Sequence, residues 1–262
     1  MSRGRMKLCA VVPAAGRGTR LGLELPKLLA PLGNGETIWT VLRRKLLAVA
    51  DHINVIVSPG GELLIREAIE EKGLAGRVSL SLQPEPLGMG DAIFRGYPVW
   101  SRAAAILIVW GDQVFVSAET LSNACALHGG ASRTAVLPLV SLAEPYVDYV
   151  FADDGRLCAV RQTREGDLCA PNGYADIGTF VLSVPDLLSA WTAYLAQAPL
   201  GALTNETNFV PFLPYLSSIG WTVKRLVIAD PREARGVNTP DDLAYFRSSF
   251  AGDRQHKSKR PR

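Results

Sequence analysis

The chain has 262 residues, of which 48% are hydrophobic and 20% charged, so it is long enough to bury a core without disulfides or structural metals. Its formal net charge of +3 is gathered at one end, because residues 252–262 hold five basic residues and one acid. That segment carries +4 and the remainder −1, which argues against the basic body of a nucleic-acid-binding protein. We expect residues 252–262 to form a disordered, solvated basic tail.

Cysteine and histidine usage argues against a disulfide framework and against a zinc site. No two of the four cysteines have C-x-x-C spacing, and the three histidines are far apart in the sequence. No run of about 18 apolar residues is present, so no membrane span is expected. These features predict a cytoplasmic protein with reduced thiols and with neither a membrane nor a nucleic acid as its partner.

The first half of the chain alternates predicted strands with predicted helices. Short apolar runs predict strands over 6–13, 53–57, 78–82, 104–110 and 134–139. Helical spacing predicts helices over 37–50, 62–72, 90–100 and 118–128. This order is typical of an α/β protein with a mainly parallel sheet covered by helices on both faces, a Rossmann-like three-layer α/β/α arrangement. Ligands of such sheets bind at the carboxyl ends of the strands.

The second half is less regular, and no linker separates it from the first. Strands are expected over 146–152, 157–161, 177–183 and 221–228, and helices over 187–198, 209–219 and 241–249. We therefore expect one domain over residues 1–251, followed by the tail.

A glycine-rich loop follows the first predicted strand directly. It reads Ala14-Ala15-Gly16-Arg17-Gly18-Thr19-Arg20-Leu21, and Pro26-Lys27 comes soon after. Backbone amides in such a loop can cradle phosphate oxygens, and the nearby cations favour a polyanion. A Walker sequence is absent, and the third glycine of a dinucleotide-binding G-x-G-x-x-G would be needed one residue before Gly22. A nicotinamide-dependent oxidoreductase is therefore disfavoured.

The pattern Gly16-x-Gly18-Thr19-Arg20-Leu21 followed by Pro26-Lys27 resembles the signature of sugar-phosphate nucleotidyltransferases, above all of their uridylyltransferases. The likeness runs from about residue 7 to 246. It implies transfer of a nucleotidyl group from an NTP, with UTP as first choice, to a sugar 1-phosphate, with Mg²⁺ as cofactor, and it allows a homodimer. It also implies that Ala14 to Thr19 line the nucleotide, that Arg20 binds the triphosphate and that Lys27 contacts the reacting phosphates.

Three further segments match the family in order. Gln83 and Gly88 fall in the segment that holds the base, with Met89 where the family has threonine. Gly111-Asp112 ends the most apolar strand, and the family's matching aspartate binds magnesium. Asn238, in Gly236-Val237-Asn238, matches a second magnesium ligand, and both side chains offer the oxygen atoms that Mg²⁺ prefers.

The acceptor side matches the family less closely. Asp176 stands where the family has an asparagine two residues before a glycine, here Gly178. Gln162 falls where the uridylyltransferases carry a sugar-binding glutamate, and Glu206 matches a later glutamate. The resemblance thus divides the domain into a nucleotide-binding half at about 6–140 and a sugar-phosphate-binding half at about 141–235.

No Ser-His-Asp set or other catalytic base is visible, and none is needed, because a phosphate monoester is ionised at neutral pH. Two alternatives stay open from the sequence. One is a cytidylyl- or guanylyltransferase with a non-sugar phosphate acceptor, such as a polyol phosphate, choline phosphate or a cofactor precursor. The other is a non-catalytic regulatory protein that binds a sugar nucleotide.

Overall fold

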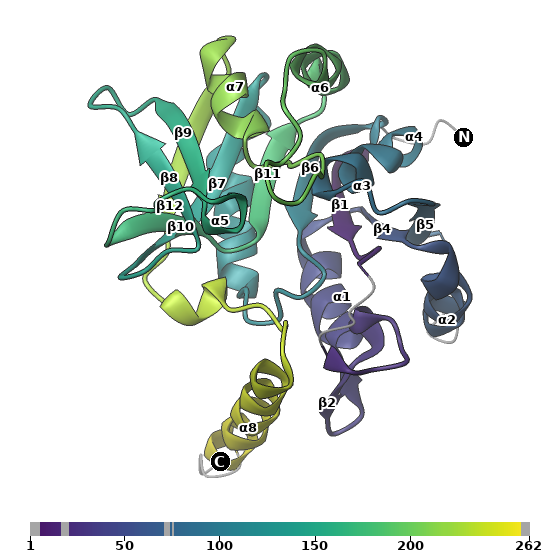
Figure 1. The fold of residues 1–262 in the computed structure, drawn as a ribbon. Coiled ribbons are helices and arrows are strands. Elements are labelled where there is room, and N and C mark those ends of the chain that lie inside the picture. The colour runs from purple at the N-terminus through teal and green to yellow at the C-terminus, as the bar shows by residue number, and fades with distance from the viewer. Residues whose placement is uncertain (1–5, 17–20, 71–73, 75, 258–262) are drawn as a thin grey trace.

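The computed structural model describes residues 6–16, 21–70, 74 and 76–257. Its centre is a run of parallel strands in the order β6-β1-β4-β5 (Figure 1). These strands are β1 (Met6–Pro13), β4 (His52–Val57), β5 (Val78–Leu82) and β6 (Ala103–Val109). Because they run in the same direction, their carboxyl ends meet at one edge of the sheet, where ligands of α/β proteins bind.

Beyond β6 the sheet is mixed. β11 pairs antiparallel with β6 and β7, while β10 pairs antiparallel and β12 parallel with β7. The bounds are β7 (Thr134–Leu142), β10 (Gly173–Asp176), β11 (Thr179–Ser183) and β12 (Thr222–Val227). A separate antiparallel hairpin of β8 (Val147–Phe151) and β9 (Leu157–Gln162) packs beside β10. The second half of the chain therefore extends the parallel core sideways.

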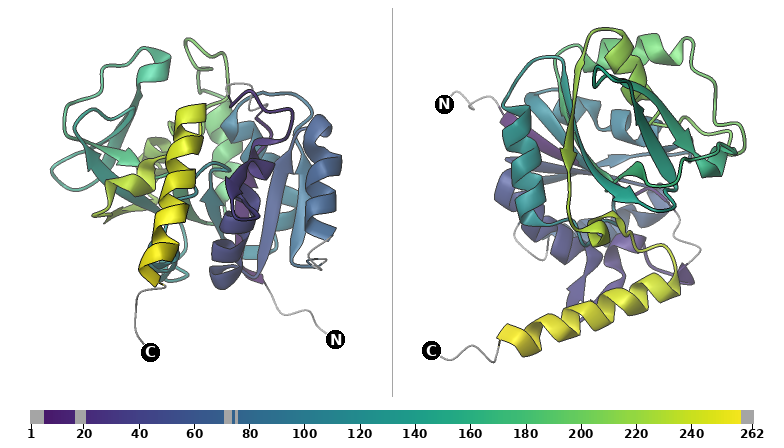
Figure 2. Two further views of the ribbon diagram at one scale, coloured as in Figure 1. Left: turned by 90° about the horizontal axis from the view of Figure 1, so that it is seen from below. Right: turned by 90° about the vertical axis from the view of Figure 1, so that its left-hand side faces the viewer.

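Helices cover both faces of the sheet, which gives three layers (Figure 2). One face carries α1 (Ile38–Val49), α2 (Pro59–Glu70) and α5 (Ala118–His128); the other carries α3 (Met89–Arg95), α4 (Tyr97–Trp100), α6 (Leu187–Leu195) and α7 (Phe212–Ser218). The alternation of side chains along β1 explains this division. Ala10 and Val12 pack into the first hydrophobic cluster, whereas Cys9 and Val11 pack into the second. The predicted Rossmann-like α/β fold is confirmed.

One predicted element is divided in the structure, and another is shortened. The helix expected over 90–100 becomes α3 and α4, separated at Gly96, because Pro98 has no N–H to donate to the preceding turn. A side chain at Gly96 would also meet the Asn54 amide oxygen. The strand expected over 177–183 begins at Thr179 as β11, because the φ of +66° at Gly178 leaves the β region, and the strand β10 before this turn was not predicted. This turn brings Asp176 to the end of its strand.

A small hairpin of β2 (Pro31–Gly33) and β3 (Glu36–Thr37) was not anticipated. Asn34 and Gly35 form its turn, and both have positive φ, as tight hairpin turns require. Short 3₁₀ helices in the described part of the chain include η2 (Lys27–Leu29), η3 (Thr163–Glu165) and η4 (Pro231–Ala234).

The closing helix α8 (Pro240–Lys257) is longer than the sequence suggested. Thr239 caps its start: the Asp242 amide donates to the Thr239 hydroxyl at 3.1 Å, and that hydroxyl donates to the Asp242 carboxylate. The helix continues eight residues beyond Ser249, so residues 252–257 of the expected disordered tail are helical, a correction. Residues 258–262 lie outside the described part of the chain.

Within the described residues, every helix is too short or too polar to cross a membrane.

Candidate active site

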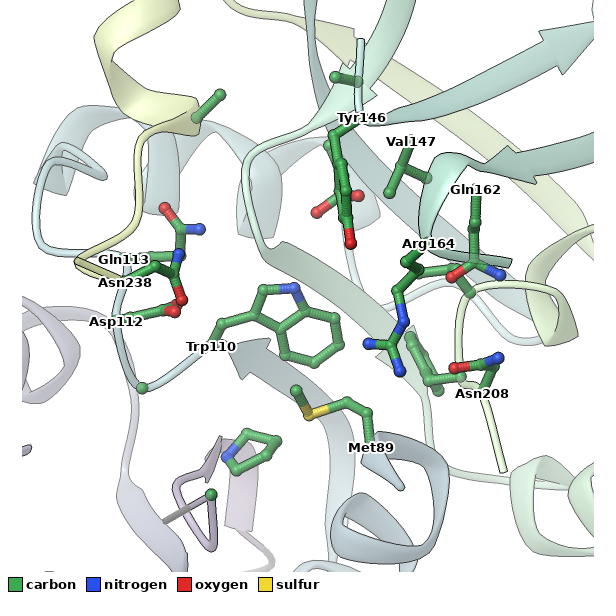
Figure 3. Close-up of a pocket in the computed structure, with 18 of the residues that line it drawn as sticks. Met89, Trp110, Asp112, Gln113, Tyr146, Val147, Gln162, Arg164, Asn208 and Asn238 are labelled. Carbon is green, nitrogen blue, oxygen red and sulfur yellow. The ribbon is translucent and has the colours of Figure 1, made fainter. Parts of the chain in front are cut away.

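A cavity of about 630 Å³ opens at the carboxyl ends of the parallel strands (Figure 3). Its walls come from the loops after β1 and β6, from η2, and from the second half of the chain. The position follows from topology, because parallel strands on either side of β1 deliver their following loops to the same edge.

Three residues from separate segments meet at one end of this cavity. The Lys27 ammonium donates to Asp112 Oδ2 at 3.0 Å and to Asn238 Oδ1 at 3.1 Å. The Lys27 and Asp112 side chains are only 22% and 17% exposed, so the ion pair is partly shielded from water. The Val237 amide donates to the Asp112 carbonyl at 3.0 Å, which fixes the two loops together. The sequence predicted all three residues as site residues, and the structure brings them together.

The glycine-rich loop contributes its backbone to the same end. Pro13, Ala14 and Gly16 line the cavity, whereas Ala15 is buried and is not part of the lining. Gly111 also lines the cavity, and a side chain there would lie 3.1 Å from the Pro13 carbonyl. The loop after β6 therefore packs so closely against the loop after β1 that a side chain at position 111 would be crowded. Four of the predicted residues in this loop lie outside the described part of the chain: Arg17, Gly18, Thr19 and Arg20.

The loop predicted to hold the base lies behind the cavity. The Gln83 amide nitrogen donates to the Gly88 carbonyl at 3.0 Å and to the Asp91 carboxylate at 2.9 Å. Gly88 has a φ of +110°, and its Cα faces the backbone of Thr207 too closely to admit a side chain. Neither Gln83 nor Gly88 lines the cavity, which is lined instead by Met89, the first residue of α3. A contact of Gln83 with a base stays a prediction.

Of the four residues predicted for the acceptor, two line the cavity: Asp176, and Gln162, which lies across Trp110 from Asp112 (Figure 3). Gly178 lies behind the cavity wall, where a side chain would collide with Trp110 and Gln113. Glu206 is outside the lining and is paired with Arg164. Two of the four residues predicted for the acceptor therefore line the cavity, and the other two contact residues of its wall.

Asp176 is held in a partly desolvated position. Its carboxylate accepts from the Tyr149 hydroxyl at 3.0 Å and from the Gly178 amide at 2.7 Å. Burial raises the pKa of Asp176, and these two hydrogen bonds act in the opposite direction. Burial, with the neighbouring carboxylate, also raises the pKa of Tyr149 well above its ordinary value, so the tyrosine keeps its proton and acts as the donor.

Two lining residues near Gln162 were missed by sequence reasoning, namely Arg164 and Asn208. The Arg164 guanidinium donates to Glu206 at 2.8 Å, and the Asn208 amide donates to Glu165 at 2.9 Å. Glu165 also accepts from the Leu203 amide and from the amide and hydroxyl of Thr204. About 40 residues separate the partners, and no family motif covers 163–165, so no sequence signal marked them.

The Glu165 carboxylate therefore holds the loop over residues 201–208 in place through these hydrogen bonds. Although burial raises the pKa of Glu165, the hydrogen bonds from Thr204, Leu203 and Asn208 outweigh that effect and hold its pKa at about 2. A carboxylate that accepts several hydrogen bonds stays ionised at any physiological pH. Glu165 therefore fixes Asn208 at the cavity wall.

Asp112 and Asn238 are the residues that could hold a divalent metal ion. They offer a carboxylate oxygen and an amide oxygen, both hard ligands, and Mg²⁺ commonly binds through one or two protein groups while it keeps several waters. Lys27 shows that a cation is accommodated between these two oxygens. The donor set fits magnesium.

The sequence matches the family described as the MobA-like NTP transferase domain over residues 10–207. This chain belongs to that family. It is therefore a nucleotidyltransferase, a nucleotide-binding enzyme of the sugar-phosphate nucleotidyltransferase type, and the matched range covers the loops that carry Lys27 and Asp112. Asn238 lies beyond the match.

Two similar proteins are bifunctional GlmU proteins. The one from Acidithiobacillus ferrooxidans (strain ATCC 53993 / BNL-5-31) is 29% identical over 247 residues, covering 92% of this chain and 51% of its own length. The one from Azotobacter vinelandii is also 29% identical, over 260 residues, covering 94% of this chain and 52% of its own length. This MobA-like chain therefore spans about half the length of these relatives.

Among solved structures, 4-diphosphocytidyl-2C-methyl-D-erythritol synthase from Anaerococcus prevotii DSM 20548 is similar, with a TM-score of 0.65 and 14% identity. The match covers 94% of this chain and 98% of the other. At that identity it supports the nucleotidyltransferase fold alone.

Proposed function

We propose that this enzyme transfers a uridylyl group from UTP to a sugar 1-phosphate and releases pyrophosphate. One observation carries the proposal: Lys27, Asp112 and Asn238 meet at one end of a cavity whose other end is polar. Figure 3 shows Trp110 between these two ends, with Arg164, Gln162 and Asn208 on the far side. The similarity to GlmU proteins supports UTP and a sugar phosphate as first candidates.

The reaction needs positioning and charge neutralisation rather than a base. The acceptor phosphate is already ionised at neutral pH and attacks the α-phosphorus of the nucleotide in line, with pyrophosphate as the leaving group. Lys27 would contact the reacting phosphates, and the backbone at Ala14, Gly16 and Gly111 would line the nucleotide. Magnesium, when held by Asp112 and Asn238, would supply further neutralisation of phosphate charge.

The far end suits a hydroxylated acceptor. Gln162 and Asn208 offer amide groups there, and Arg164 offers a guanidinium suited to phosphate. Asp176 adds a carboxylate to the cavity lining. Trp110, Met89 and Phe209 give an apolar surface on which the carbon face of a sugar ring can rest. A sugar phosphate presents both kinds of surface.

The decisive test is pyrophosphate release from each of the four NTPs with a panel of sugar 1-phosphates and polyol phosphates, with and without MgCl₂. We expect release from UTP with a sugar 1-phosphate, and only with the metal. Release from CTP with a polyol phosphate alone would favour the cytidylyltransferase alternative. Nucleotide binding without turnover on any acceptor would favour a regulatory protein. Because UTP and sugar phosphates are cytoplasmic metabolites, we also place the enzyme in the cytoplasm, which cell fractionation would check.

A further inference from the structure

The loop that follows Asp112 is held from outside the cavity by a lysine of α1. Residues 113–117 form neither helix nor strand, so their carbonyl groups need other partners. The Lys45 ammonium donates hydrogen bonds to the carbonyls of Val114 and Val116 in this loop, both at 2.7 Å. One side chain therefore satisfies two carbonyl groups within four residues of Asp112.

A glutamate ties the same loop to the segment that carries Asn238. Glu233, in η4, is only 7% exposed. Its carboxylate accepts from the Ser117 amide at 3.0 Å and from the Thr120 hydroxyl at 3.0 Å. Thr120 lies in the first turn of α5, so Glu233 joins the start of α5 to the chain five residues before Asn238.

The two anchored segments converge on the Asp112 backbone. The Asp112 carbonyl accepts from the amides of Val114 and Val237, each at 3.0 Å. A side chain at Gly236 would lie 3.1 Å from the Asp112 carboxyl carbon, so the second segment packs directly on that carboxylate. Burial lowers the pKa of Lys45 to about 8, and the attraction of Glu233 opposes this shift. The lysine therefore keeps most of its charge at neutral pH.

We propose that Lys45 is a positioning residue which, together with Glu233, sets the separation of the Asp112 carboxylate and the Asn238 amide at which a divalent cation binds. The metal part rests on the proposed function, whereas the geometric part does not. Groups that orient metal ligands without touching the metal typically change metal affinity or activity by about 10- to 100-fold when removed.

The chain offers a matched control for loss of a partly buried lysine. Lys224 of β12 donates to the Leu127 carbonyl at 3.0 Å, near the opposite end of α5 from Glu233. Lys224→Met also removes a hydrogen bond from a lysine to a backbone carbonyl, but at a place distant from Asp112. Lys45→Met keeps the apolar stem of the side chain and removes only the amine.

Two measurements test the proposal: Mn²⁺ binding followed by electron paramagnetic resonance, and crystal structures of the wild type and both variants. We expect Lys45→Met to raise the dissociation constant for Mn²⁺ about 10-fold or more and to displace Asp112 relative to Asn238. Lys224→Met should change the Mn²⁺ constant less than about twofold and leave both segments in place. Unchanged positions of Asp112 and Asn238 in Lys45→Met overturn the proposal, whatever the activity.

The two proposals fail separately. If the wild type transfers no nucleotide but Lys45→Met still moves Asp112, the proposed function fails while the assignment of Lys45 stands. If Lys45→Met does not fold, Thr120→Val removes one hydrogen bond to Glu233 and should give a smaller displacement in the same direction. An unchanged structure and unchanged Mn²⁺ affinity in Thr120→Val then overturn it.

Discussion

The Lys27 ammonium lies 3.0 Å from the Asp112 carboxylate and 3.1 Å from the Asn238 amide oxygen, so one cation contacts both oxygen atoms proposed to hold the metal. These residues are separated by 85 and 211 positions in the sequence. If a metal ion took these two oxygens, the ammonium would have to leave them, and it would then be free to contact the phosphates of a bound nucleotide. We therefore expect the position of Lys27 to change when a nucleotide binds with its metal ion.

Replacing Lys27 with alanine should lower turnover at least ~100-fold, because the charge contact with the reacting phosphates is lost. The readout is kcat for pyrophosphate release at saturating substrates. Lys7→Ala, at the exposed start of β1, is the control for removal of one lysine. Near-normal turnover in Lys27→Ala would show that Lys27 takes no part in the reaction.

Asp112→Ala should abolish magnesium-dependent turnover and leave the fold intact. The Asp112 carbonyl, rather than its side chain, binds the Val114 and Val237 amides, so the loop contacts survive the change. Asp112→Asn keeps an oxygen ligand without the charge and should show intermediate activity with a higher magnesium requirement. Magnesium titrations of turnover, beside thermal unfolding by circular dichroism, separate these effects. Normal activity of Asp112→Ala at low magnesium would refute the metal assignment.

How well a feature of this protein can be predicted depends on how far apart in the sequence the contacting residues lie. The parallel core follows from local patterns, because apolar strands alternating with helices allow few arrangements, and the carboxyl end of β6 places Asp112 at the sheet edge. Asn238 could be placed only through the family motif. The environment of Gln83 was not predictable, because whether an amide faces a ligand or holds its own loop is decided by side-chain packing.

The acceptor end was the least predictable part of the site. Its arrangement depends on Arg164 with Glu206 and on Glu165 with Asn208, contacts that join η3 to an irregular segment about 40 residues later. Neither periodicity nor spacing encodes such pairs. The extent of α8 was also misjudged, because a charged segment can be helical or disordered with the same composition.

Arg164→Met should raise the KM for the acceptor about 10- to 100-fold and change the KM for the nucleotide much less. A hydrogen bond to a charged group contributes about 1.5–3 kcal/mol, and about 1.4 kcal/mol corresponds to a factor of ten in binding. Arg161→Met is the matched control, since Arg161 lies three residues earlier, in β9, at 46% exposure and outside the cavity lining. An equal rise of the acceptor KM in both variants would show that Arg164 has no specific role in binding the acceptor.

Glu165→Gln should make the free energy of unfolding less dependent on pH in acid. The folded protein holds the pKa of Glu165 at about 2, below its ordinary value of 4.5. A carboxylate with a lowered folded pKa stabilises the fold fully above about pH 4.5 and loses this contribution as the pH falls toward 2. Glutamine carries no charge, so the variant should be less stable by about 1–3 kcal/mol at pH 7, and the difference from wild type should shrink between pH 5 and 2.

Urea unfolding at pH 7, 5, 4 and 3 measures this difference directly. Glu67→Gln, on the exposed face of α2, controls for the loss of one acidic side chain. A difference between wild type and Glu165→Gln that stays constant from pH 7 to pH 3 would contradict the prediction, because it would mean that ionisation of Glu165 does not hold the 201–208 loop. Loss of acceptor affinity in the same variant at pH 7 would then have to come from the shape of the side chain rather than from its charge.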